Sequence, residues 1–528
     1  MQILYGRRAE DGKEIALSQV KKDFCEIEYT DFPETPFITD KISMRFLKNK
    51  LIYLLYVRDN VLYVAASNPE DYDVLDAIKI ATGFEVKALK ARDDDISRAI
   101  EQHYKVGQSS VDEIIGDIAP HDLDGGINDE DIDHLRDMAS EAPVVRLVNH
   151  IMSTAIGCRA SDIHIEPFEK ILKVRYRIDD ILHEREVLPR SLQAAVVSRV
   201  KILANLNIAE RRLPQDGKIN ARLGGKDIDL RVATVPTVHG EGIVIRILDR
   251  GGLVLDLREL GLIGENKRKF EYMITKPHGM ILVTGPTGSG KTTTLYAALE
   301  KLNTSDRKII TIEDPVEYQL EGINQIQVKP QIGLTFANGL RNIVRQDPDI
   351  ILVGEIRDRE TAEIAIHAAL TGHLVFSTLH TNDAAGAITR LVEMGLTDYL
   401  LASTLIGVVA QRLFRRICAN CKKAVAPNEL EMNELKGIMR GDIKDVKIYK
   451  GEGCKECVST GYWGRIAAFE ILVVDDNIRA LILKSPGANT IKSAAVNSGM
   501  TTLKEDSLRM VIDGTTTMEE VIRVIQEG

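Results

Sequence analysis

One short run of residues constrains the fold of this chain more than any other. Met280–Leu302 reads MILVTGPTGSGKTTTLYAALEKL, which is an apolar strand, a glycine-rich turn and a helix in direct succession. The turn Gly285–Thr292 matches the G-x-x-x-x-G-K-[ST] pattern of phosphate-binding loops, with the strand before it and the helix after it that the pattern requires. Strands and helices alternate from about residue 260 to 410, which predicts an α/β domain with a largely parallel sheet.

Each residue type in this turn has a physical role. Glycines let the backbone turn tightly, so that several N–H groups point at phosphate oxygens, and the helix N-terminus adds partial positive charge. Lys291 is expected to reach the β- and γ-phosphates of ATP, and the Thr292 hydroxyl to ligate Mg²⁺. The predicted nucleotide-binding residues are Gly285, Pro286, Thr287, Gly288, Ser289, Gly290, Lys291, Thr292 and Thr293. A glycine-rich turn without nucleotide is the alternative, and the strand–loop–helix context disfavours it.

Two further apolar strands end in acids. KIITIEDPVEY (Lys308–Tyr318) brings Glu313 to the end of one strand, and PDIILVGEIRD (Pro348–Asp358) brings Glu355 to the end of another. Ligands of open α/β sheets bind at the carboxyl ends of the strands, so we expect these acids to share one crevice with the phosphate loop. A single acid of this kind would more often be a solvated strand end. A set of them beside a complete phosphate loop favours catalysis.

These motifs resemble those of the secretion and pilus motor ATPases. The phosphate loop, TIEDPVEY, ILVGEIRD and the histidine box TGHLVFSTLHTND (Thr371–Asp383) occur in the order found in that family, and Gly354-Glu355 is its usual second acidic motif. ASDIHIEP, RLPQDGKI, DLRVATVPTVHGEG and IRILD match as well, so the resemblance extends from about residue 30 to the C-terminus. It implies an α/β fold with a RecA-like P-loop ATPase core, preceded by an α+β, PAS-like domain and a small N-terminal α+β domain.

The resemblance also implies roles for single residues. Glu355 would activate the attacking water, and Glu313 would help to organise metal and water. His373 and His380 would sense or link the nucleotide state, although from the residues alone each could be a satisfied strand-end histidine.

Arginines are the other implied catalytic residues. Arg231 and Arg246 resemble those that contact nucleotide phosphates when the second domain closes over the core, and such arginines stabilise charge on the transferring phosphoryl group. The alternative is a structural ion pair. Arg341, Arg345 and Arg357 are further candidates that could instead form local pairs with nearby aspartates.

Four of the six cysteines form two C-x-x-C pairs. CANC (Cys418–Cys421) and CKEC (Cys454–Cys457) supply four thiolates, a set that suits a tetrahedral, structural Zn²⁺. A pair of redox disulfides is the alternative, which a reducing compartment disfavours. The family resemblance includes a metal module of this layout, and we expect a clasp that contacts a partner. Cys25 and Cys158 are isolated and are expected in the core.

The bulk composition narrows the function class. The net charge is −10 and the sequence pI about 5.7, which disfavours a nucleic-acid-binding protein. No apolar run reaches the roughly 18–20 residues that span a bilayer, and the best candidate, Tyr399–Ala410, is expected to be a buried helix. The N-terminus lacks the apolar core of a signal peptide. We therefore expect a cytoplasmic protein that a partner holds at the inner face of the inner membrane.

We expect six parts along the chain. These are a platform-docking domain at 1–105, an acidic flexible linker at 106–141, a second domain supplying arginines at 142–255, the RecA-like core at 256–410, a four-cysteine zinc module at 411–470 and a helical region at 471–528. Some relatives bind a cyclic dinucleotide with a helical N-terminal module, whose leucine–glycine pattern we do not find. The resemblance of residues 23–105 is to the portion that docks on an inner-membrane platform.

The function implied is that of a homo-hexameric motor that hydrolyses ATP, with Mg²⁺ and Zn²⁺ as cofactors. Within the family the chain is most similar to the ATPases that drive pseudopilus assembly and export in type II secretion, with the type IV pilus extension ATPases as the alternative. Its expected partner is the inner-membrane platform protein, and no nucleic acid is expected. A DNA translocase would instead show DNA-stimulated, salt-dependent hydrolysis. A non-enzymatic scaffold would hydrolyse no ATP, so Glu355→Gln would change nothing.

Overall fold

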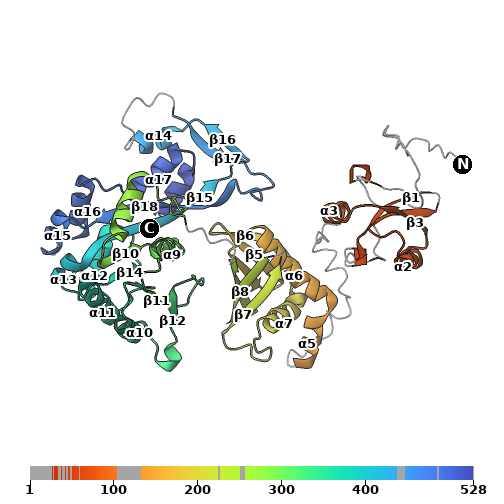
Figure 1. The fold of residues 1–528 in the computed structure, drawn as a ribbon, viewed down its shortest axis with the longest axis horizontal. Coiled ribbons are helices and arrows are strands. Elements are labelled where there is room, and N and C mark those ends of the chain that lie inside the picture. The colour runs from red at the N-terminus through yellow and green to blue at the C-terminus, as the bar shows by residue number, and fades with distance from the viewer. Residues whose placement is uncertain are drawn as a thin grey trace. The chain divides into compact units, whose positions relative to one another are not determined.

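The computed structural model describes residues 27–103 apart from 28, 34–36, 38–41, 43–45, 48–49 and 59, and then residues 132–223, 226–249, 256–436, 446–484 and 487–526. The chain divides into two compact units, Met1–Asp122 and Leu123–Gly528 (Figure 1). The first 26 residues, with Cys25, lie outside the described residues, as does 104–131, which includes most of the linker expected at 106–141.

The first unit is a small α+β domain. Its strands are β1 (Ile52–Arg58), β2 (Val61–Ala66) and β3 (Glu85–Lys90), with the helices η1 (Tyr29–Asp31), α2 (Tyr72–Thr82) and α3 (Asp93–His103). The order is β1-β2-β3, with β1 and β2 antiparallel and β2 and β3 parallel. The helix α2 connects the two parallel strands, begins at the Asp71 cap and ends at Gly83 in the left-handed conformation.

In the second unit, residues 132–249 form a six-stranded antiparallel sheet with helices on one face (Figure 1). The strands are β4 (Asp162–Pro167), β5 (Ile171–Ile178), β6 (Ile181–Pro189), β7 (Gln215–Leu223), β8 (Lys226–Thr237) and β9 (Gly240–Asp249), in the order β6-β5-β4-β9-β8-β7. The helices are α5 (Ile132–Ser140), α6 (Ala142–Gly157), η3 (Arg190–Leu192) and α7 (Gln193–Leu203). Residues along β5 alternate between buried and partly exposed, so one sheet face is apolar and the other is polar.

The helix α5 differs from the sequence prediction, which placed this segment in the flexible linker. Leu135, Met138 and Ala139 are buried, and α5 packs against α6 and α7. The apolar face of this short helix consists of only three buried residues. In a segment of acidic composition, so short a pattern was too weak to predict a packed helix.

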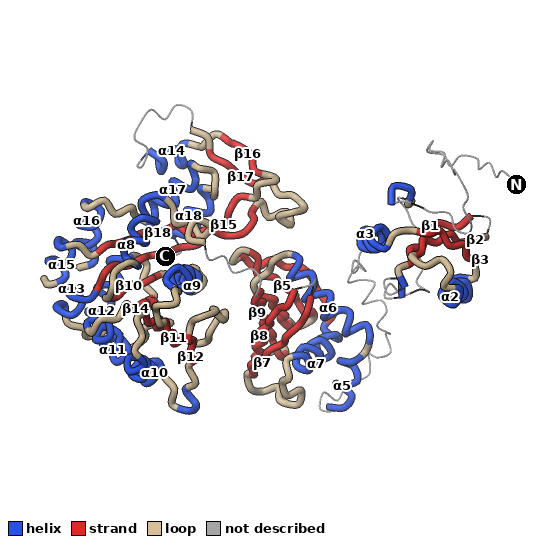
Figure 2. Tube along the Cα trace, viewed as in Figure 1, coloured by secondary structure: helices blue, strands red, loops and turns tan. Residues whose placement is uncertain are grey.

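Residues 256–417 together with 462–473 build a seven-stranded sheet with helices on both faces (Figure 2). The strands are β10 (Gly279–Thr284), β11 (Ile309–Glu313), β12 (Asn324–Gln327), β13 (Ile350–Val353), β14 (Leu374–Leu379), β15 (Leu405–Ile417) and β18 (Tyr462–Val473), in the order β12-β11-β13-β14-β10-β15-β18. The helices are α8 (Gly264–Ile274), α9 (Lys291–Leu302), η4 (Pro330–Ile332), α10 (Phe336–Ile343), η5 (Val344–Gln346), α11 (Arg359–Leu370), α12 (Ala384–Glu393) and α13 (Asp398–Thr404). All neighbouring strands are parallel except the pair β15 and β18.

The segment Tyr399–Ala410 is not one buried helix, as predicted, but a helix followed by a strand. The helix α13 ends at Thr404, and Leu405–Ala410 forms the first half of β15. Val408, Val409 and Ala410 are fully buried between β10 and β18. A short apolar run has no periodicity that separates helix from buried strand, and the β-branched residues favour the strand here.

The remaining elements surround the cysteines and the C-terminus. They are β16 (Lys422–Val425), α14 (Glu429–Lys436), β17 (Ile448–Gly451), α15 (Asp476–Ile482), α16 (Ala488–Asn497), α17 (Leu503–Ile512) and α18 (Met518–Gln526). The buried carboxylate of Glu520 fastens α18 to β15, since it accepts hydrogen bonds from Arg415 at 2.7 Å and Arg523.

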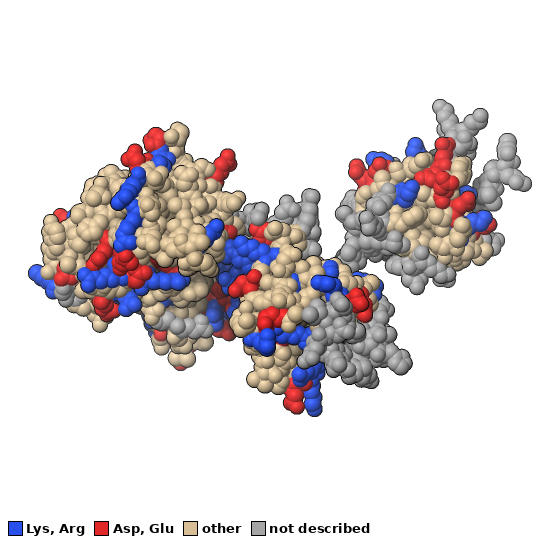
Figure 3. All heavy atoms as spheres, turned by 90° about the horizontal axis from the view of Figure 1, so that it is seen from below, with Lys and Arg blue, Asp and Glu red and all other residues tan. Residues whose placement is uncertain are grey.

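The surface is of mixed charge. The face seen in Figure 3 carries acidic as well as basic side chains, in keeping with the net charge of −10. Within the described part of the chain, every helix is too short or too polar to cross a bilayer.

Candidate nucleotide site

The phosphate loop lies between the end of β10 and the start of α9, at the carboxyl edge of the sheet. Gly285, Gly288 and Gly290 have φ values of +149°, +81° and +83°, a region that favours glycine. A Cβ on Gly285 would lie 2.5 Å from the carbonyl oxygen of Gln411. A Cβ on Gly290 would lie 2.9 Å from the side-chain nitrogen of the same glutamine. The loop therefore needs glycine for its conformation and for its close approach to β15.

Lys291 is folded back over its own loop. Its ammonium donates hydrogen bonds to the carbonyl oxygens of Gly285 at 2.8 Å and Pro286 at 2.9 Å. Burial lowers the pKa of Lys291 to about 8. The Ser289 hydroxyl is buried beside it without a hydrogen-bond partner. A buried cation with only neutral partners and an unpaired hydroxyl fit an anionic ligand such as a phosphate.

Glu355 follows β13 at the same edge of the sheet. Its carboxylate forms an ion pair with Arg357, and one carboxylate oxygen lies 3.4 Å from Nε2 of His380. Burial alone would raise the pKa of Glu355, but the hydrogen bonds and charges of Arg357 and His380 outweigh it and hold the pKa below its ordinary value. Gly354 precedes it because a Cβ there would meet the backbone of β11 at 3.3 Å.

The two predicted histidines are separated by the length of β14. His380 follows the carboxyl end of the strand and joins Glu355. His373 precedes the strand, and its Nδ1 lies 2.9 Å from the carbonyl oxygen of Ala368. The structure thus brings His380 to the candidate site and places His373 at the opposite edge of the sheet.

Glu313 ends β11, yet its carboxylate is buried in a network of neutral donors. It accepts hydrogen bonds from the hydroxyls of Tyr296 and Thr311, both at 2.5 Å, and from Gln325 at 3.3 Å. Only 3% of the residue is exposed. Burial first, and then the Glu313 charge, raises the pKa of Tyr296. In this structure Glu313 ties β11 to the helix that follows the phosphate loop, and its role toward metal stays a prediction.

The predicted arginines of the second domain have different partners. The Arg231 guanidinium donates to the carbonyl oxygen of Val316 at 3.1 Å and pairs with Glu317 at 3.1 Å. It therefore reaches TIEDPVEY (Thr311–Tyr318), which we call the acidic box of the core. Arg246 donates to Asp162 at 2.9 Å within its own domain, and its side chain is 60% exposed.

Three arginines near the second acidic motif were candidates, and of these Arg357 contacts the predicted catalytic Glu355. Arg357 pairs with Glu355, whereas Arg341 pairs with Glu360 on α11. Arg345 is exposed in η5.

The four cysteines of the two pairs come together as one cluster of free thiols. Their sulfur atoms all lie within 4.8 Å of one another. Cys418 and Cys454 are 3.8 Å apart, Cys421 and Cys457 are 3.9 Å apart, and Cys454 and Cys457 are 3.7 Å apart. Four sulfurs at 2.3 Å from a tetrahedral Zn²⁺ are about 3.8 Å from one another, so the cluster fits this ion. Backbone N–H groups of Cys454 and Gly461 also donate to the Cys457 sulfur.

Comparison with protein families identifies the group of proteins to which this chain is similar. The model of the family described as type II/IV secretion system protein matches residues 137–523. The chain belongs to this family. A second model, that of the MshEN domain, matches residues 23–110, which include the described part of the first unit. The predicted resemblance to the secretion and pilus motor ATPases is confirmed.

Individual relatives of the family match nearly the whole chain. The type II secretion system protein E of Xanthomonas campestris pv. campestris is 51% identical over 490 residues, covering 92% of this chain and 85% of that protein. The type IV pilus assembly ATPase PilB of Myxococcus xanthus is 43% identical over 497 residues, covering 94% and 88%. The type II secretion system ATPase E of Vibrio cholerae is 48% identical over 394 residues, covering 75% and 78%.

A solved structure supports the fold. The ATPase DotB of Legionella pneumophila has a TM-score of 0.53 and 22% identity, and the match covers 72% of this chain and 95% of that one. The predicted α/β class with a P-loop ATPase core is confirmed, and this member of the secretion family is an ATPase.

Gln411 is a residue of the site that the sequence prediction missed. It is 2% exposed on β15, and its amide nitrogen donates to the Ser289 carbonyl at 2.8 Å. Its amide oxygen accepts from the Thr294 hydroxyl, also at 2.8 Å. The one available signal was a polar pair, Gln411-Arg412, that interrupts the apolar run VVAQRLF. This family member therefore braces its phosphate loop from the neighbouring strand.

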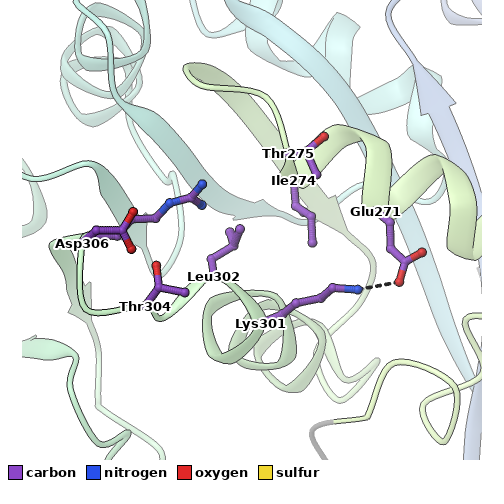
Figure 4. A pocket seen from close by; sticks show the side chains of 8 residues that line it. Glu271, Ile274, Thr275, Lys301, Leu302, Thr304 and Asp306 are labelled. Atoms are coloured by element: carbon purple, nitrogen blue, oxygen red, sulfur yellow. Dashed lines mark hydrogen bonds and ion pairs between the residues drawn. The ribbon is translucent and has the colours of Figure 1, made fainter.

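A separate concavity lies at the other end of α9 and contains none of the predicted residues (Figure 4). Its lining residues are Glu271, Ile274, Thr275, Lys301, Leu302, Thr304, Asp306 and Arg307. Lys301 and Glu271 pair across it at 2.5 Å, so their charges neutralise each other.

Proposed function

We propose that this ATPase powers protein export by a type II secretion system, through assembly of a pseudopilus. The observation that carries the proposal is the convergence of Lys291, Glu355 and the acidic box on one sheet edge, in a chain that is 51% identical to a type II secretion protein E. A pilus assembly ATPase that is 43% identical supports the second candidate, a motor for type IV pilus extension.

Binding of ATP begins at the phosphate loop. The Lys291 ammonium exchanges its bonds to the Gly285 and Pro286 carbonyls for oxygens of the β- and γ-phosphates, so charge pairing replaces neutral hydrogen bonds. The exposed Thr292 hydroxyl is the group of this loop that would hold Mg²⁺, which would supply positive charge to the phosphates.

Hydrolysis uses Glu355. Its pKa below the ordinary value keeps the carboxylate ionised, so it orients the attacking water or accepts its proton. Arg357 and His380 hold this carboxylate before nucleotide binds.

Arg231 and Arg246 complete the proposed site when the second domain closes over a nucleotide. Arg231 already lies at the acidic box, where it would exchange Glu317 for a phosphate. Arg246 is largely exposed and anchored at its base by Asp162, so its guanidinium is available to a phosphate. Charge supplied by domain closure couples hydrolysis to movement. Glu313 and His373 act indirectly in this scheme, by holding the elements around the site.

The cysteine cluster is proposed to hold Zn²⁺ through Cys418, Cys421, Cys454 and Cys457. The ion supplies no catalysis there, because four thiolates leave no open coordination position. It fixes the loops that follow β15 and precede β18, the two strands behind the phosphate loop. We regard it as a structural clasp that contacts a partner.

The assembly is proposed to be a homo-hexamer that acts at the inner face of the inner membrane. The first unit would dock on the inner-membrane platform protein, and contact with the membrane would be indirect. Nucleic acid has no part in the mechanism. We keep the proposed six-part division, with α5 transferred from the linker to the second domain.

The proposal is tested by Lys291→Ala at the native locus, with exported proteins assayed in the medium and pili on the surface. Lys484→Ala, which alters an exposed lysine after α15, is the control and should change neither. Loss of export with normal pili is the expected result. Loss of pili with normal export would overturn it in favour of pilus extension.

A further inference from the structure

A row of charged residues crosses the polar face of the six-stranded sheet in the second domain. The strand registers pair Lys218 with Arg231, Arg231 with Arg246, Arg246 with Asp162, and Asp162 with Arg177. Directly paired residues of antiparallel strands project to the same face, with Cβ atoms roughly 4.5–5.5 Å apart. Four cations and one carboxylate therefore lie side by side over β7, β8, β9, β4 and β5. We refer to these five residues as the cross-sheet row.

Within the cross-sheet row itself, four cations lie beside a single carboxylate. Like charges directly opposite one another are destabilising. Asp162 lies 2.9 Å from Arg246 and 3.9 Å from Arg177, and only 8% of its side chain is exposed, so it compensates that end. Arg177 is fixed further by a hydrogen bond to the carbonyl oxygen of Asp180 at 3.0 Å.

The excess positive charge collects at the other end of the row. Arg231 has a counter-ion, but it comes from the core, where Glu317 belongs to the acidic box. Lys218 is exposed and has no ion pair with any residue that the structure describes. An anion from outside the sheet can therefore pair with Lys218.

The position of Arg231 shows where that acceptor would lie. Its contacts, Val316 and Glu317, follow the end of β11, beside the carboxyl edge that carries the phosphate loop. Lys218 is its cross-strand neighbour, about 5 Å away at Cα. The four-carbon side chain of a lysine spans that distance, so Lys218 can reach an anion that Arg231 contacts.

On the basis of the proposed ATPase function, we propose that Lys218 is a further phosphate-contacting residue for ATP. It acts with Arg231, while Asp162 serves as the fixed counter-ion that orients Arg246. The row then offers a triphosphate a line of cations in which Arg246 and Arg177 are compensated by Asp162, Arg231 by Glu317 of the core, and Lys218 by none of these. Lysine suits this outer position, because it contributes a point charge without a fixed geometry.

The test compares Lys218→Ala with Lys173→Ala in the full-length chain. Lys173 projects from β5 on the same sheet face but is paired with Glu184 at 2.8 Å, which makes it a matched control. Steady-state hydrolysis should show KM for ATP about three- to tenfold higher in Lys218→Ala, the size of one charge-assisted contact, with little change in kcat. Lys218→Arg should restore KM, which a loss of structure would not permit. Equal KM values in the two alanine variants would overturn the proposal.

A second measurement separates this proposal from the proposed function. Binding of inorganic tripolyphosphate, followed by calorimetry, requires no turnover and should weaken in Lys218→Ala but not in Lys173→Ala. If the wild-type chain binds tripolyphosphate in this way and hydrolyses no ATP, the role of Lys218 stands and the ATPase function fails. If hydrolysis is normal and tripolyphosphate binds both variants equally, the role of Lys218 fails alone.

Discussion

Replacement of Gln411 by leucine should weaken ATP binding without touching any group that contacts the nucleotide. The Gln411 amide joins two parts of the phosphate-loop unit, the Ser289 carbonyl and the Thr294 hydroxyl, each at 2.8 Å. Leucine has a similar volume and keeps β15 apolar, but it satisfies neither partner. The loop would then lose its lateral support while Lys291 and the glycines stay intact.

The expected magnitude follows from these two bonds. Each leaves a buried polar partner unsatisfied, at roughly 1–3 kcal/mol, so the loop loses about 2–6 kcal/mol of support, with about 4 kcal/mol at the middle of that range. Nucleotide must restore part of this order on binding. If about a third to a half of the loss appears in binding, KM for ATP rises roughly tenfold, since about 1.4 kcal/mol corresponds to a factor of ten.

The assay is steady-state hydrolysis over a range of ATP concentrations, with Asn266→Leu as the control. Asn266 is 6% exposed on α8 and donates one hydrogen bond to the Phe469 carbonyl at 3.0 Å, on another part of the same sheet. Both variants should lower the melting temperature, but only Gln411→Leu should raise KM. A KM that rises equally in both would show that general destabilisation, and not bracing of the loop, accounts for the effect.

Two further predictions concern the buried carboxyl group of Asp506 and the cysteine cluster. Burial raises the pKa of Asp506 from 3.8 to about 6, so the folded state holds this proton longer than the unfolded state does. The stability associated with the protonated form is therefore present below about pH 4 and lost as the pH rises through 6. Asp506→Asn keeps an acceptor for the Phe469 N–H but carries no charge at any pH. It should therefore stabilise the protein by up to about 3 kcal/mol at pH 7.5 and have no effect on stability at pH 4. Thermal unfolding of both proteins at the two pH values tests this expectation. For the cysteine cluster, metal analysis should find one Zn²⁺ per wild-type chain and almost none in Cys421→Ser, whereas Cys158→Ser, which changes an isolated cysteine, should retain it. Normal zinc content in Cys421→Ser would contradict the four-thiolate site.

The parts of the site that the sequence predicted are those in which local pattern and chemistry agree. The strand, glycines, lysine and helix of the phosphate loop are contiguous, and each acidic strand end is visible as an apolar run that stops at a carboxylate. The clustering of the four cysteines was predictable for a similar reason, because two C-x-x-C pairs together indicate a site with four thiolate ligands.

The features that the sequence did not predict depend on contacts between distant residues. Gln411 and Ser289 are joined across β15 and β10, and nothing near either residue in the chain indicates the pairing. His373 and His380 look equivalent at the two ends of LVFSTL, yet a parallel strand has only one end at the nucleotide edge. Glu313 was expected to face metal, but the Tyr296 hydroxyl that occupies its carboxylate comes from a different element.

The most direct test of the central claim is hydrolysis by Glu355→Gln, measured together with ATP binding. Glutamine keeps the size and most hydrogen bonds of Glu355 but cannot take a proton from water, so the release of phosphate should fall at least about a hundredfold while ATP binding stays within a few-fold of wild type. Glu363→Gln, which alters an exposed glutamate paired with Arg359 on α11, should leave both unchanged. Undiminished phosphate release from Glu355→Gln would contradict the account, because the carboxylate held by Arg357 and His380 would then have no part in activating water.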